Sequence, residues 1–125
     1  MDATAFRWSD VDQDNPIDNL HRRRIMGERM LVANINLTKG CHVNPHQHES
    51  EQIAIVISGH VRWTIGAEGA QRQVEMRGGE VMVLPSNVPH GIDALEDTHI
   101  IDILSPPGAM GVDNQGKAKE AVAAD

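Results

Sequence analysis

The amino-acid sequence predicts an all-β fold, a single small domain built as a sandwich or barrel. Residues 30–104 break into short β-prone runs separated by segments that contain Gly, Pro, Asn and Asp, and this pattern is typical of such folds. No segment keeps a helical period for long. At 125 residues, the chain has the length of one domain that can bury a hydrophobic core.

Alternation of apolar and polar residues defines the expected strands and their faces. The five expected strands are residues 31–37, 52–57, 61–65, 81–85 and 99–104. In the first run every second residue is apolar, from Leu31 to Leu37, so we expect one buried face. The third run alternates in the same way and places Trp63 on the inward face.

The two ends of the chain differ from this central part. Residues 1–26 are polar, contain proline and have few apolar positions, so we expect an N-terminal arm that packs loosely or pairs with another subunit. Residues 108–125 combine glycines with Ala, Lys and Glu, which favours a short flexible tail ending in a marginal helix. The barrel is expected to occupy residues 27–107.

Composition excludes several classes of partner. The formal net charge is −7, whereas affinity for nucleic acids comes mainly from clustered Lys and Arg, so we expect no nucleic-acid partner. The basic run at residues 22–24 is expected to lie on a solvated surface. No run approaches the roughly 20 apolar residues of a membrane-spanning helix. With one cysteine, Cys41, and no secretion signal, the expected location is the cytoplasm.

Three histidines form a candidate metal site. His46 and His48 are two residues apart, and such residues lie on the same side of an extended chain, so both imidazoles can reach one point. Gln52 is an even number of positions from both histidines and is expected to point to the same side, whereas Glu51 is not. This spacing favours Gln52 as a fourth ligand. His90 closes a proline-containing turn after an apolar run, from which it can reach the same end of the barrel.

Three imidazoles and one oxygen suit one divalent transition metal ion (Zn, Fe, Ni, Mn or Cu) with positions left open for water or substrate. The alternative is that the HxH pair lies on the surface without a ligand role, because the chain uses histidine freely. Its other histidines are His21, His42, His60 and His99.

The segment around these residues resembles the first motif of the cupin superfamily, in which a Gly precedes HxH, an acidic ligand and a second Gly. Residues 40–59 read GCHVNPHQHESEQIAIVISG, with Gln52 where Glu is usual. Residues 79–90, GEVMVLPSNVPH, resemble the second motif, with Asn87 where Gly is usual. The resemblance implies a jelly-roll β-barrel, a homodimer, and one metal site formed by His46, His48, Gln52 and His90.

Within this superfamily, the sequence is similar to small members with three His ligands and one Gln, including enzymes that linearise 4,5-unsaturated uronates. The similarity rests on EQI, PSNVPH and the Asp of IDILSPP. It implies that this residue, Asp102, is catalytic. The Arg that normally follows the SPP segment is replaced by Gly108, and Leu104 stands where an aromatic residue is common.

These features favour a metal-dependent, non-redox enzyme of lyase or isomerase type that acts on a small oxygenated substrate such as a sugar acid. A neutral Gln ligand leaves the charge of the ion undiminished, which strengthens it as a Lewis acid. Asp102 lies among apolar residues that raise a carboxyl pKa, which suits a general acid or base; a structural role at the strand end is the alternative. The other hypotheses are a metal-dependent dioxygenase and a non-catalytic cupin that binds a small ligand.

Overall fold

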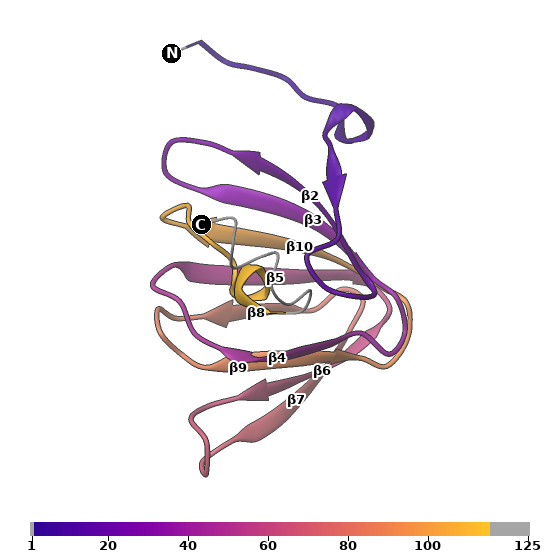
Figure 1. The fold of residues 1–125 in the computed structure, drawn as a ribbon, viewed down its shortest axis with the longest axis vertical. Coiled ribbons are helices and arrows are strands. Elements are labelled where there is room, and N and C mark those ends of the chain that lie inside the picture. Colours follow the sequence, from indigo (N-terminus) through magenta and orange to yellow (C-terminus); the bar gives the residue numbers. More distant parts are fainter. Residues whose placement is uncertain (1, 116–125) are drawn as a thin grey trace.

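The computed structural model describes residues 2–115, which form two antiparallel β-sheets and two short 3-10 helices (Figure 1). The larger sheet has the strand order β1 (Gln13–Asp14), β2 (Leu20–Met26), β3 (Leu31–Leu37), β10 (Thr98–Ser105), β5 (Glu51–Ser58) and β8 (Val81–Leu84). The smaller sheet has the order β4 (His42–His46), β9 (His90–Ala94), β6 (His60–Ile65) and β7 (Arg72–Arg77). The helices are η1 (Trp8–Asp10) and η2 (Gly111–Asn114). The all-β jelly-roll prediction is confirmed.

The hydrophobic core lies between the inward faces of the two sheets, as the alternation predicted. Along β3, buried positions alternate with more exposed ones from Leu31 to Leu37. Trp63 on β6 is 3% exposed, so its predicted inward orientation is confirmed. Side chains as deeply buried as Leu31 and Leu104 each contribute about 1.5–3 kcal/mol to stability. The paired strands therefore form a packed frame that fixes the positions of the side chains pointing into the barrel.

The N-terminal region differs from the expected arm. Leu20–Met26 is strand β2, and it pairs with β3 along its whole length, from Leu20 opposite Leu37 to Met26 opposite Leu31. Ile17 and Leu20 are buried in the core. The sheet thus begins well before residue 27. The sequence pattern did not reveal β2, because one of its two buried residues is an arginine and the strand therefore lacks a clear alternation of apolar and polar residues.

The C-terminal region also contacts the barrel more closely than expected. Met110 and Val112 are each 6% exposed and belong to the hydrophobic core, and η2 packs near β4. The prediction of a flexible tail from residue 108 is therefore wrong for this part. The predicted marginal helix falls in residues 116–125, outside the described residues. No helix among the residues that the structure describes is long and apolar enough to cross a membrane.

Candidate metal centre

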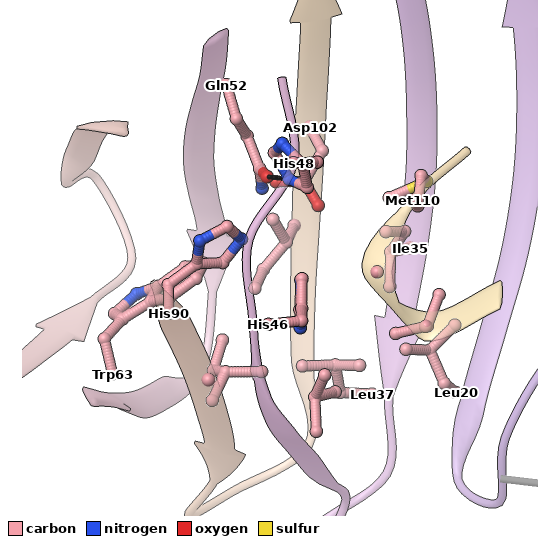
Figure 2. A pocket seen from close by; sticks show the side chains of 16 residues that line it. Leu20, Ile35, Leu37, His46, His48, Gln52, Trp63, His90, Asp102 and Met110 are labelled. Carbon is pink, nitrogen blue, oxygen red and sulfur yellow. Dashed lines mark hydrogen bonds between the residues drawn. The ribbon is translucent and has the colours of Figure 1, made fainter. Parts of the chain in front are cut away.

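The three predicted histidines lie together at one end of the barrel (Figure 2). His46 is the last residue of β4, His90 is the first residue of β9, and the two are paired in register. His48 follows in the loop before β5. One nitrogen from each ring lies within 4.8 Å of the others, so the cluster can hold a metal ion. Antiparallel pairing of β4 and β9 therefore brings together residues that are distant in the sequence.

Backbone carbonyls orient all three imidazole rings. The Nδ1 atoms of His46, His48 and His90 lie 2.9 Å from the carbonyl oxygens of Asn44, Ser50 and Val88, respectively. A carbonyl oxygen only accepts a hydrogen bond, so these contacts favour a proton on Nδ1. Nε2 of His90, which has no partner among the described residues, is thus left with its lone pair, which is the arrangement that second-shell partners impose on metal-binding histidines.

Gln52 lies beside this cluster and Glu51 does not. Gln52 is on the inward face of β5 and is 5% exposed, and its Oε1 atom lies 3.1 Å from Nε2 of His48. Glu51 is exposed. The structure thus places an amide oxygen, rather than a carboxylate, next to the imidazoles, in agreement with the parity argument.

The electrostatics of the cluster fit a bound cation. The pKa of His90 is lowered to about 4, mainly by burial and also by repulsion from His46 and His48, and the hydrogen bond to the Val88 carbonyl opposes this decrease. Burial also lowers the pKa of His46. Nε2 of His90 is buried and has no hydrogen-bond partner among the described residues. A neutral donor set with an unsatisfied buried lone pair fits a divalent transition metal ion.

Asp102 lies in the same cavity, on the inward face of β10 (Figure 2). Its two neighbours in register are Ala33 on β3 and Ala54 on β5, whose small side chains leave space for the carboxyl group. Burial raises the pKa of Asp102 to about 7, and hydrogen bonding to Gln52 opposes this increase. Its Oδ1 atom is buried and has no partner within the described part of the chain. Asp102 is therefore a carboxyl group that changes its protonation state near neutral pH.

The cavity that contains these residues has a volume of about 50 Å³ and is lined otherwise by apolar side chains. Trp63 contributes to its wall, with its ring centroid 6.2 Å from that of His90. Met110, Gly111 and Val112 also line it, although the sequence reasoning assigned them to a flexible tail. The only sequence signal for them was a pair of apolar residues, Met110 and Val112, within a polar, glycine-rich segment.

A β-barrel with three converging imidazoles can hold a metal ion. The sequence comparison identifies the class of protein, because the cupin domain model matches residues 34–104. The chain belongs to the cupin family.

Two proteins of known structure share this fold, and a third protein is similar in sequence. KdgF from Halomonas sp. is 27% identical, with a TM-score of 0.72 over 84% of this chain and 96% of that protein. Oxalate decarboxylase from Bacillus subtilis is 25% identical, with a TM-score of 0.73 over 81% of this chain. H2HPP isomerase from Bacillus subtilis is 34% identical over 62 residues, half of this chain. The chain spans only 28% of that decarboxylase and 25% of that isomerase.

Proposed function

We propose that this chain binds one divalent transition metal ion through His46, His48, His90 and Gln52 and catalyses a non-redox reaction of lyase or isomerase type on a small oxygenated substrate such as a sugar acid. The observation that carries the proposal is the convergence of three imidazole rings, one of which has its Nε2 atom buried without a partner among the described residues. Two of the similar proteins are, by name, a decarboxylase and an isomerase, which supports this type of reaction.

The residues around the site have distinct roles in this proposal. A bound divalent ion would polarise an oxygen of the substrate as a Lewis acid. The three imidazoles and the Gln52 amide are neutral donors, so they leave the positive charge of the site undiminished. Asp102, with a pKa near neutrality, accepts a proton from the substrate or returns one to it. The apolar walls exclude water from this proton transfer.

Metal analysis tests the first part of this proposal. Protein purified without a histidine tag and without added metal is expected to contain about one equivalent of a transition metal per chain, as expected for a single site of this type. A subsequent substrate screen with and without O₂ separates non-redox chemistry from a dioxygenase reaction, because only the latter requires O₂. Protein that contains no metal and takes up none from solution would contradict the proposal.

We further propose that the chain forms a homodimer through the outer face of the larger sheet. On that face Ile103 lies in register between Val32 and Ile53, and Ile53 is in register with Val83 at the edge strand. Val83 is 58% exposed. A contiguous apolar surface on a sheet is typical of an interaction site, and the cupin resemblance favours a second copy of the chain as the partner.

Val83→Glu is expected to convert this dimer into a monomer, because it places a charge within an apolar interface. Light scattering after size-exclusion chromatography measures the change. Gln73→Glu on β7 is the matched control, because it adds the same charge to an exposed position of the other sheet. A wild-type protein that is monomeric, or a Val83→Glu dimer of unchanged stability, would refute the proposed interface.

A further inference from the structure

Residues 110–115, which we call the C-terminal segment, lie over the proposed metal site. Met110 and Val112 are buried in the cavity that contains the three histidines. Gly111 lies against the face of the His46 ring, since a methyl group at Gly111 would overlap Cγ, Cδ2 and Nε2 of that imidazole. No side chain larger than hydrogen fits there unless the segment or the ring moves. The C-terminal segment therefore forms one wall of the site.

This wall differs in its attachment from the rest of the cavity. Apart from His48, all other lining residues belong to strands of the two sheets. The C-terminal segment is attached by side chains instead. The amide of Gln115 accepts a hydrogen bond from the backbone N–H of Asn44, 2.9 Å away, and donates one to the Asn44 carbonyl at 3.1 Å. The interior of the cavity, about 50 Å³, leaves little room for a substrate beside the histidines while this wall is in place.

Arg22 holds the other side of this segment. Its side chain is only 1% exposed, so the predicted solvated position of this residue is wrong. Nη2 of Arg22 lies 2.8 Å from Oδ1 of Asp113, and Nη1 lies 3.6 Å from Sδ of Met110. The second oxygen of Asp113 accepts the backbone N–H of Met110 at 2.9 Å. Asp113 thus connects the buried guanidinium to the start of the segment.

Arg22 also has a second carboxylate partner that does not belong to the wall. Nε and Nη2 lie 3.1 Å and 2.9 Å from the two oxygens of Asp14 on β1. A buried charge without a partner is strongly unfavourable. Because Asp14 binds the guanidinium through both oxygens, Arg22 keeps a charged partner when Asp113 moves away. The arrangement therefore permits the wall to open without leaving the arginine unpaired.

We propose that Arg22 is a positioning residue which, through Asp113, holds the C-terminal segment closed over the metal site, and that metal ions and substrates enter when this contact opens. The nature of the molecules that enter rests on the proposed function, whereas the closure itself does not. Arg22 contacts neither the histidines nor Asp102 among its hydrogen-bond partners, so it acts only through the segment.

Asp113→Asn and Asp14→Asn provide a matched test, because each replaces one carboxylate partner of Arg22 by a neutral group of the same shape. The probe is the zinc-loaded protein, and the measurement is the rate at which Zn²⁺ is transferred to excess chelator. Asp113→Asn is expected to accelerate release about tenfold or more, in line with the loss of a charge-assisted hydrogen bond. Asp14→Asn is expected not to accelerate release, because its bonds to Arg22 do not attach the wall and their loss leaves Arg22 without a carboxylate partner when the wall opens.

Equal release rates in Asp113→Asn and the wild type would overturn the proposal. So would equal acceleration in both variants, because that result would indicate a general loss of stability around Arg22. The thermal unfolding midpoints of the two variants are measured alongside the release rates. If Arg22 only stabilised the fold, the midpoints would fall but the two variants would release zinc at similar rates.

Hydrogen exchange in the metal-free protein separates this proposal from the proposed function. Asp113→Asn is expected to accelerate exchange of the backbone amides in residues 110–115 and to leave that of β10 unchanged, whereas Asp14→Asn is expected to accelerate neither. If the chain binds no metal, the proposed function fails while this measurement still decides whether Arg22 holds the segment. Unchanged exchange in residues 110–115 of Asp113→Asn would overturn the closure.

Discussion

His90→Ala is expected to abolish tight binding of a divalent metal ion. His90 is the most deeply buried histidine of the cluster, and its Nε2 atom has no other partner within the described residues. Removal of an outer-shell partner typically costs about 10- to 100-fold in metal affinity, and removal of a direct ligand is expected to cost more. Competition between the protein and a chromophoric chelator for Zn²⁺ or Co²⁺ measures the change.

His60→Ala is the matched control for this experiment. His60 is also buried and also begins a strand, but its Nε2 atom lies 2.7 Å from Oε1 of Glu75 and not in the cluster. This variant is expected to be less stable and to keep its metal affinity. If His90→Ala bound the ion as tightly as the wild type, the three-histidine cluster would not be the metal site.

Asp102→Asn is expected to abolish turnover of an identified substrate while it leaves the metal content unchanged. The amide has nearly the same shape as the carboxyl group, but it cannot accept or release a proton near neutral pH. Loss of a general acid or base typically lowers the rate about 10²- to 10⁴-fold. Steady-state kinetics and metal analysis on the same preparation provide the two measurements. Turnover that survives the substitution would exclude the proposed role of Asp102.

The same variant has a second expected effect, on the stability of the metal-free protein. The pKa of Asp102 is raised from 3.8 to about 7 in the folded state, so the fold favours the protonated form. The associated stability is fully present below pH 3.8 and is lost as the pH rises to about 7, because the unfolded chain releases this proton first. A shift of this size corresponds to about 4 kcal/mol.

Asp102→Asn removes this ionisation, so the metal-free variant is expected to be more stable than the wild type at pH 8. Its free energy of unfolding is also expected to decrease less between pH 4 and 7, the interval bounded by the two pKa values of Asp102. Urea unfolding at several pH values measures the free energy of unfolding. Asp12→Asn, at an exposed position, is the control and is expected to follow the wild type. If the free energy of unfolding depended on pH in the same way in Asp102→Asn and the wild type, ionisation of the Asp102 carboxyl group would not destabilise the fold, and the expectation would be wrong.

The strands that the sequence predicted are those with a local signal. β3, β5, β6, β8 and β10 contain apolar residues that alternate or continue over several positions. The missed strands, β1, β2, β4, β7 and β9, are very short or carry charged, histidine or glycine residues at many positions. In β7, for example, Met76 is the only fully buried side chain. Such strands are stabilised by pairing with neighbours, which no local pattern in the sequence reveals.

The sequence by itself determined the fold class, the convergence of His46 and His48, and the orientation of Gln52 rather than Glu51 toward them. These features depend on spacing along one stretch of chain, and the two-residue period of an extended strand translates spacing directly into direction. The matched motif additionally pointed to His90.

Only the tertiary structure decided the surroundings of the site. It buried Arg22 between Asp14 and Asp113 and laid Gly111 on the ring of His46. The contacts of Asp113 with Arg22 and of Gly111 with His46 join residues far apart in the sequence, and their formation depends on sheet order and on charge pairing between distant residues. The sequence does not distinguish a buried arginine from a surface arginine. Burial of the charge requires a carboxylate close in space, and its position is known only from the tertiary structure.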